Sequence, residues 1–202
     1  MQANLYDGCT MGDLIQRAIE RGGDRVAFIL DDQKITYREF GSLLSRFIQA
    51  LAERGVRKGD AIAALSSNRP EAFMASAAAF VMGLRITWMH PLGSEDDHAY
   101  LLEDSGVTTL LVDPPVFGER AHALMRRLPA LKNVYGFGPN DFGEDILAAA
   151  QAYTAAPLQQ QAHAQLAARV RHLAVVSDAA AWRTARNCWR RRGRSDHGPR
   201  PR

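Results

Sequence analysis

The chain has 202 residues, of which 47% are apolar and 23% are charged, and this length is enough to bury one sizeable core. Residues 1–150 carry 15 Lys and Arg against 20 Asp and Glu, a balance of −5, whereas residues 151–202 carry 10 against 2, a balance of +8. These balances exclude a basic body: the basic pI of about 9.1 reflects the last quarter of the chain and not residues 1–150.

Cysteine content and hydropathy favour a soluble, cytoplasmic protein. Cys9 and Cys188 give no disulfide framework and suit a reducing compartment. The opening residues MQANLYDGCT lack the basic and apolar regions of an export signal. The longest apolar stretch, residues 72–84, contains Ser76 and is shorter than the ~20 residues that a membrane span needs.

The first elements are two capped helices on either side of a hairpin. Thr10 and Asp13 can cap a helix that ends at Gly22-Gly23, and the runs VAFIL and KIT around Asp31-Asp32-Gln33 predict a β-hairpin. Thr36 and Glu39 form a capping box for a helix that reaches Gly55. Its apolar stripe could bind a partner, but we interpret it as ordinary core packing.

The next elements alternate between strands and helices. AIAAL is an apolar strand, SSNRP a turn, residues 71–82 a helix and LRITWM a second strand, which together predict a parallel β-α-β unit. The alternation continues with a helix that starts at Ser94, the strand VTTLLVD, a helix over 116–127, a strand over 134–137 and a helix over 141–153. Residues 10–153 thus predict an α/β fold, an open and mostly parallel sheet with helices on both faces.

Ligands of such sheets bind at the carboxyl ends of the strands, so SSNRP and HPLGS are the loops of interest. Ser66, Ser67, Asn68 and Arg69 could hold a phosphate or a carboxylate, although a polar turn and helix cap is the favoured interpretation. His90 could act as a base or a ligand, but it has no ligand partner at metal-site spacing.

No complete active site follows from the motifs. Asp96, Asp97 and His98 cluster at a helix start, where acids are expected for dipole reasons, so no metal site is predicted. GFGPND at Gly136 has Asp141 where a dinucleotide fingerprint needs its third glycine, and neither a Gly-Lys-Ser/Thr loop nor a GxSxG elbow occurs.

The order of these signals resembles the start of an AMP-forming acyl-CoA synthetase (fatty-acid–CoA ligase) of the adenylate-forming superfamily. The resemblance runs from about Met11 to Asp113, and more weakly to Tyr153. HPLG at residues 90–93 indicates fatty-acyl or aryl-acid ligases rather than peptide-synthetase domains. The matching positions are Gly55, Val56, Gly59, Asp60, Asn68, Glu71, Pro91, Tyr100, Leu102, Asp104 and Ser105.

The resemblance implies activation of a carboxylic acid by MgATP to an acyl-adenylate, followed by transfer to coenzyme A. ATP, Mg²⁺ and CoA are thus implied for a full-length relative, and none can be demonstrated for this chain. The family's loop Thr-Gly-x-Pro-Lys-Gly is absent, since residues 154–202 contain no lysine. No catalytic or cofactor-binding residue can be carried over, so the sequence predicts an inactive N-terminal fragment with an unpaired sheet edge.

The sequence divides into residues 1–155, a partial N-terminal subdomain, and residues 156–202, a tail rich in Ala, Gln and Arg. In residues 170–202 apolar periodicity fades and every basic residue is Arg, which predicts disorder. Two explanations remain. A shifted reading frame in GC-rich codons is favoured, and the alternative is a non-enzymatic module whose arginines, with Trp182 and Trp189, bind nucleic acid or an acidic partner.

Overall fold

The computed structural model of the protein describes residues 10–159. The expectations for Cys9, for Cys188 and for the arginine-rich residues 170–202 lie outside the described residues. Along the chain, the elements are α1 (Met11–Gly22), β1 (Val26–Leu30), β2 (Gln33–Thr36), α2 (Tyr37–Glu53), β3 (Ala61–Leu65), α3 (Pro70–Met82), β4 (Arg85–Trp88), α4 (Glu95–Asp104), β5 (Thr109–Val112), α5 (Pro114–Arg127), β6 (Asn133–Gly136), β7 (Glu144–Asp145) and α6 (Ile146–Ala150).

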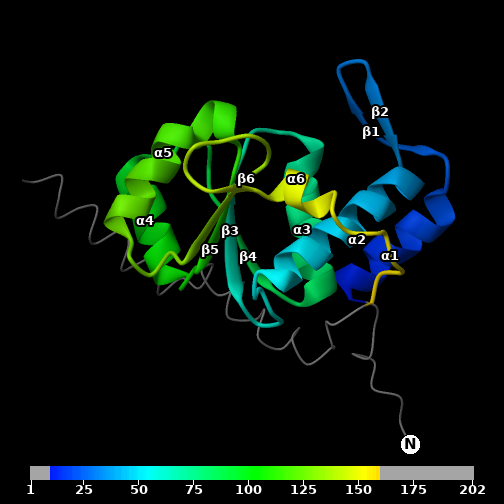
Figure 1. Ribbon diagram of the computed structural model, residues 1–202, viewed down its shortest axis with the longest axis horizontal. Coiled ribbons are helices and arrows are strands. Elements are labelled where there is room, and N and C mark those ends of the chain that lie inside the picture. Colours follow the sequence, from blue (N-terminus) through cyan, green and yellow to red (C-terminus); the bar gives the residue numbers. More distant parts are fainter. Residues whose placement is uncertain (1–9, 160–202) are drawn as a thin grey trace, which may run out of the picture. The chain divides into compact units, whose positions relative to one another are not determined.

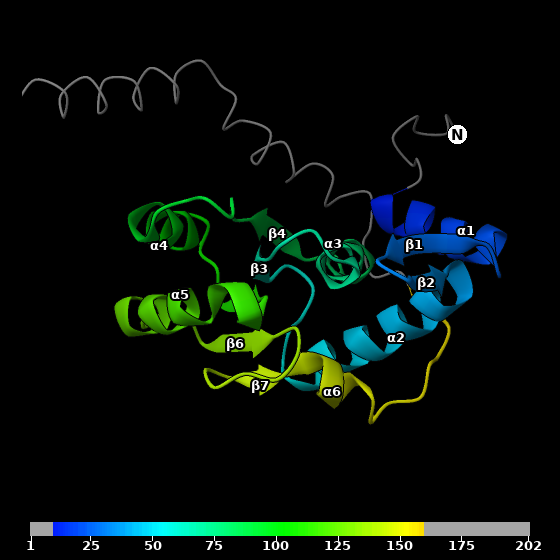
Figure 2. The same ribbon diagram turned by 90° about the horizontal axis from the view of Figure 1, so that it is seen from above.

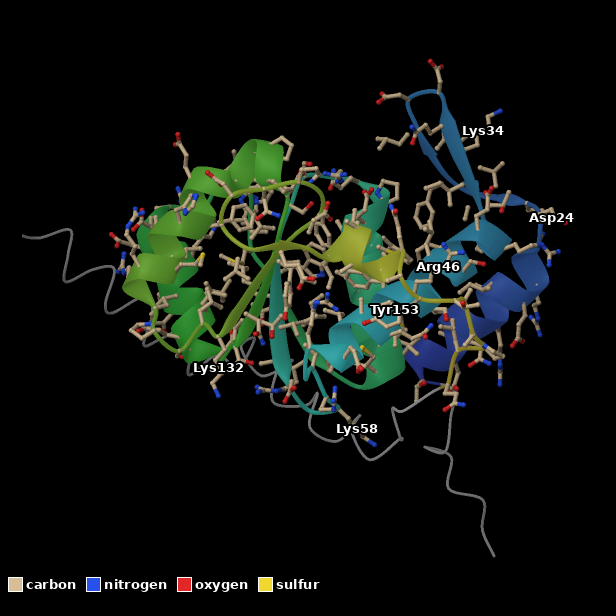
Figure 3. The ribbon with its side chains drawn as sticks, viewed as in Figure 1. Asp24, Lys34, Arg46, Lys58, Lys132 and Tyr153 are labelled. Carbon is tan, nitrogen blue, oxygen red and sulfur yellow. The ribbon has the colours of Figure 1, made fainter. Side chains whose placement is uncertain are left out.

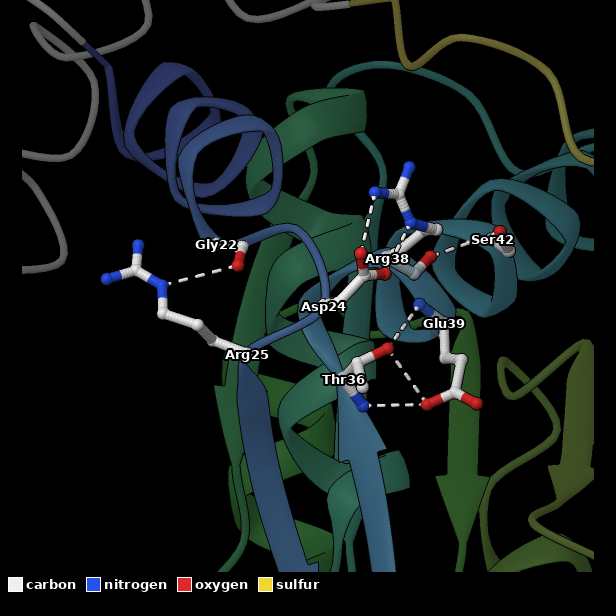
Figure 4. Close-up of polar contacts among 7 residues, drawn as sticks. All are labelled: Gly22, Asp24, Arg25, Thr36, Arg38, Glu39 and Ser42. Carbon is white, nitrogen blue, oxygen red and sulfur yellow. Dashed lines mark hydrogen bonds and ion pairs between the residues drawn. The ribbon is translucent and has the colours of Figure 1, made fainter.

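Capping boxes begin the helices α1, α2 and α4, and the sequence predicts the caps at Thr10 and Thr36 and the helix start at Ser94. At the start of α2, the Thr36 hydroxyl accepts a hydrogen bond from the Glu39 backbone N–H, and the Glu39 carboxylate accepts one from the Thr36 N–H at 2.8 Å (Figure 4). The same reciprocal pairs occur at Thr10 with Asp13 and at Ser94 with Asp97. Each box satisfies backbone donors that a helix start would otherwise leave unpaired.

Five strands form a parallel sheet in the order β4-β3-β5-β6-β7, which confirms the predicted fold class. In the register of β3, which lies between β4 and β5, Ala63 is beside Thr87 of β4 and Leu110 of β5. All five residues of β3 are buried, which explains why its sequence is continuously apolar rather than alternating.

Helices cover both faces of this sheet (Figures 1 and 2). One core lies on the face covered by α2, α3 and α6, and it contains Ile62 and Leu111 of the sheet together with Phe47 and Phe137. A second core lies on the face covered by α4 and α5 and contains Leu110. Successive strand residues supply opposite faces, so β3, β5 and β6 each contribute to both cores.

The hairpin of β1 and β2 stands beside the sheet and pairs with no strand of it (Figure 1). It is attached through Phe28, whose ring lies 5.0 Å from that of Phe40 in α2 and 5.4 Å from that of Phe73 in α3. The hairpin is thus held by aromatic packing against helices and not by backbone pairing with the main sheet.

The predicted helix over 141–153 is wrong in its extent. The Asn140 side chain accepts hydrogen bonds from the backbone N–H groups of Phe142 and Gly143 and forms a turn there. Residues 144–145 then pair with β6 as the short strand β7, and Asp145 caps α6, which spans only residues 146–150.

Within residues 10–159, no helix combines the length and apolar character needed to cross a bilayer.

Candidate functional site

The strand order places a topological switch point next to β3. From β3 the chain crosses to β4 on one side of it, whereas β5, β6 and β7 follow on the other side. Ligands of doubly wound sheets bind outside the carboxyl ends of strands at such a point. Here the point lies between Ser66 and Ser67, which follow β3, and Asp113, which follows β5.

A buried carboxylate fills this switch point. The side chain of Asp113 is 3% exposed and accepts hydrogen bonds from the Ser67 hydroxyl, from the Ser67 N–H at 3.4 Å and from Arg69 Nη1 at 2.6 Å. Arg69 also donates from Nε to the Glu71 carboxylate at 2.8 Å. Ser66, likewise buried, donates to the Ser67 carbonyl oxygen at 3.0 Å.

These contacts leave Ser66, Ser67, Asn68 and Arg69, for which anion binding is the less favoured interpretation, without a free positive charge. The hydrogen bonds and charges of Glu71 and Asp113 raise the pKa of Arg69, so its guanidinium stays charged and paired with two carboxylates. A phosphate placed here would meet more negative than positive charge. The favoured cap interpretation also needs correction, because Arg69 itself is the N-cap residue of α3 and no side chain caps the helix.

A cavity of about 590 Å³ opens beside this network, between the carboxyl ends of β3 and β4. Phe73, Trp88 and Met89 line its apolar part, and the Trp88 indole donates a hydrogen bond to the Ser76 hydroxyl at 3.1 Å. Asn68 and His90 lie at its polar part. Such a lining can bind an aromatic or other apolar group and orient it through an amide and an imidazole.

The cluster of Asp96, Asp97 and His98 does not come together as a metal site. Asp97 caps α4, Asp96 pairs with Arg127 at 2.5 Å, and the buried His98 bonds to residues outside the cluster. His98 Nε2 lies 2.8 Å from the His90 carbonyl oxygen, and Nδ1 lies 2.8 Å from Arg120 Nη1. Across residues 10–159, no group of three His, Cys, Asp or Glu side chains could hold a metal ion.

Sequence reasoning missed Asp113 and Trp88 as residues of this region. Asp113 follows a strand of buried residues, which is the signal that could have placed it beside SSNRP at the same sheet edge. Trp88 ends the strand that precedes HPLG and gave no signal beyond that position.

The family model and the related sequences that match this chain point to the same enzyme family. The family model described as AMP-binding enzyme matches residues 15–191. The medium/long-chain-fatty-acid–CoA ligase FadD8 of Mycobacterium tuberculosis is 37% identical over 153 residues, which are 73% of this chain and 27% of that protein. The 2-succinylbenzoate–CoA ligase of Bacillus subtilis is 37% identical over 100 residues, 50% of this chain and 20% of that protein.

Solved structures share the fold. The anthranilate CoA ligase AuaEII, in complex with anthranoyl-AMP, superposes with a TM-score of 0.70 at 19% identity and covers 80% of this chain and 30% of its own. The amide bond synthetase McbA of Marinactinospora thermotolerans superposes with a TM-score of 0.65 at 24% identity. The match covers 75% of this chain and 30% of McbA. The chain spans about a quarter of the length of the curated relatives it matches. With the family model matching most of its residues, the chain belongs to the AMP-binding enzyme family.

Proposed function

We propose that this chain is the N-terminal part of an ATP-dependent acyl-CoA ligase, which activates a fatty or aryl carboxylic acid as its acyl-adenylate and transfers it to CoA. The observation that supports this most is the family match over a five-stranded parallel sheet, together with the similarity to a fatty-acid–CoA ligase. With two cysteines in 202 residues, we propose the cytoplasm as its location.

We further propose that the chain alone does not form acyl-adenylates. In relatives of full length the reaction uses ATP, Mg²⁺ and CoA, but the residues at the switch point of the sheet do not fit a triphosphate, because the Arg69 guanidinium is already paired with Glu71 and Asp113. The sequence also lacks the phosphate loop Thr-Gly-x-Pro-Lys-Gly. No step of the reaction is therefore assigned to a residue of this chain.

Exchange of pyrophosphate into ATP, measured with a panel of fatty and aryl acids, tests this proposal. The chain alone should give no exchange above background, and a matched ligase of full length should give exchange in the same assay. Acid-dependent exchange by the chain would contradict the proposed inactivity.

A second candidate is supported by the charge of +8 in residues 151–202. A non-enzymatic module could use this charge on nucleic acid or another acidic partner. Its binding to DNA should then weaken steeply with added salt. A chain with six of these arginines changed to glutamine is the matched control, and unchanged binding by that variant would exclude this function.

We retain a shifted reading frame as the proposed origin of residues 170–202, because their composition follows GC-rich codons. The test is to translate the other two forward frames from about codon 165. Thr-Gly-x-Pro-Lys-Gly in one of them would support the proposal, and its absence from both would remove that support. Since the family match reaches residue 191, the translation should cover the whole segment.

A further inference from the structure

A basic cavity lies between β2 and α2, well apart in sequence from the switch point. It has a volume of about 460 Å³ and is lined by Lys34 and Ile35 of β2 and by residues of α2 that include Arg38, Leu43 and Arg46. Figure 3 labels Lys34 on the hairpin and Arg46 near the attachment of the hairpin to the helices. We refer to this space as the β2–α2 cavity.

Two of its cations are uncompensated. Among residues 10–159, neither the Lys34 ammonium nor the Arg46 guanidinium has a hydrogen bond or an ion pair. Arg38 donates to Asp24 through Nε at 2.7 Å (Figure 4), and this pair leaves its Nη1 donors available. Glu39 also lines the cavity, but its carboxylate is bonded to Thr36 of the capping box. The cavity therefore carries net positive charge, although residues 1–150 as a whole have a balance of −5.

Arg46 supplies the more specific observation. Its Nε is buried and has no hydrogen-bond partner anywhere in the described part of the chain, where no other buried side-chain nitrogen or oxygen is left unpaired. Buried polar groups are nearly always paired, so Arg46 is a cation whose donors are not satisfied within residues 10–159. An acceptor that also carries negative charge would match the guanidinium and the nearby ammonium.

The form of the lining favours a compact anion. A guanidinium presents a planar fork of donors, and an ammonium adds a mobile point charge, a combination suited to the several oxygens of a phosphate group. The turn of the adjacent hairpin carries Asp31 and Asp32, which would repel an anionic lipid surface. We propose that the β2–α2 cavity binds the phosphate group of a small molecule, with Arg46 and Lys34 as its principal donors.

Amide and arginine Nε resonances of the full chain, followed by ¹H–¹⁵N NMR during titration, test the proposal. Inorganic phosphate and glycerol phosphate are the two probes, which separate a free anion from a phosphomonoester, and acetate is the carboxylate comparison. We expect saturable shifts of the Arg46 Nε–H and of the Lys34 and Ile35 amides with at least one phosphate probe. Acetate should bind about tenfold more weakly, since it offers fewer acceptor oxygens.

Matched variants distinguish phosphate binding in this cavity from non-specific attraction of an anion to the positive charges of the chain. Lys34→Gln and Arg46→Gln should each weaken phosphate binding at least about tenfold, and Arg46→Lys, which keeps the charge but loses the fork, covers the case in which Arg46→Gln fails to fold. Lys58→Gln and Lys132→Gln are the controls, because both lysines are exposed and lie outside the cavity (Figure 3). Shifts that do not saturate, equal affinity for acetate, or equal losses in the control variants would overturn the proposal.

Discussion

The carboxylate of Asp113 lies buried at the carboxyl edge of the sheet, where Ser67 and Arg69 donate to it. A buried charge is tolerated when it is paired, and removal of its partner leaves the full cost of desolvation. Arg69 is the only cation among residues 10–159 that pairs with this carboxylate. The network therefore orders the loop after β3 by electrostatics as well as by packing.

Replacement of Arg69 by methionine should lower the free energy of unfolding by about 2–4 kcal/mol, because it leaves Asp113 buried without a cation. Urea unfolding of the full chain measures this. Glu71→Gln is the control and should cost less than about 1 kcal/mol, since Glu71 is partly exposed and its loss leaves the Arg69–Asp113 pair intact. Arg69→Met combined with Asp113→Asn should cost less than the sum of the two single changes, and strict additivity would contradict the coupling.

The ion pair of Glu144, in the edge strand β7, with Arg54 makes a pH-dependent contribution to the stability of the fold. The hydrogen bond from Arg54 lowers the pKa of Glu144, and the same contact raises the pKa of Arg54. A carboxyl whose pKa is lower in the folded chain stabilises it above its unfolded pKa of about 4.3, and that stability is lost as the pH falls through the folded value. About half of the Glu144 side chain is exposed, so the effect should stay below about 1 kcal/mol.

Accordingly, Glu144→Gln should be less stable than the unchanged chain at pH 7, and the difference should shrink as the pH falls below about 4. Chemical unfolding at a series of pH values measures it. Glu53→Gln serves as the control, because Glu53 is exposed and forms no ion pair within the described range. A constant difference from pH 7 to pH 3 would show that the pair does not cause the pH dependence.

At the scale of elements, α1 and α2 approach each other closely through glycine. A Cβ atom on Gly41 of α2 would lie 2.6 Å from Cγ2 of Ile19 in α1, closer than two carbon atoms can pack. Ile19 is β-branched and cannot readily turn this methyl group away. Close contact between these two helices thus depends on the missing side chain of Gly41.

Gly41→Ala tests this contact, with two opposing effects. Alanine improves helix propensity by about 1 kcal/mol, whereas overpacking costs about 1–3 kcal/mol, and we expect the clash to exceed the gain. The melting temperature should therefore fall. In an Ile19→Ala background the clash is gone, so the same glycine substitution should become neutral or stabilising. A melting temperature that falls equally in both backgrounds would exclude this contact as the cause.

Elements set by local signals were predictable from the sequence, and those set by distant partners were not. The boxes at Thr36 and Ser94 fix helix starts through residues three positions apart. The short strand β7 needs β6 as its neighbour, so periodicity alone gave a helix there. The candidate site shows the same division: Ser67 was expected at the sheet edge, but its partner Asp113 is 46 positions away and depends on the strand order.

At the scale of the whole described chain, the two cores meet through the sheet and the last residues return to the first helices. Residues 154–158 follow α6 and run along α2 (Figure 2), and Leu158 packs against the core on that face. The predicted boundary after residue 155 lies inside this segment. Buried Ser45 holds it: its hydroxyl donates to the Ala156 carbonyl oxygen at 2.8 Å and accepts from the Ala156 N–H at 2.9 Å.

Ser45→Ala should release this segment from α2. Both polar backbone groups of Ala156 lose their partner, so hydrogen exchange of the amides of residues 154–158 should accelerate, and the chain should lose about 1–3 kcal/mol of stability. Hydrogen–deuterium exchange with mass spectrometry resolves this segment from the rest. Gln49 should not compensate, since within the returning segment its side chain donates only to the Thr154 carbonyl oxygen, at 2.9 Å, and its other contacts are to Ser45 itself.

Ser42→Ala is the matched control for this measurement, because the Ser42 hydroxyl bonds only to the Arg38 carbonyl oxygen within α2. It removes the same chemical group one turn away and leaves every hydrogen bond to the returning segment in place. If residues 154–158 exchange as slowly in Ser45→Ala as in Ser42→Ala, the segment is held by the packing of Leu158 and not by Ser45. The expected difference between the two variants therefore assigns the contact between residues 111 positions apart to a single hydroxyl group.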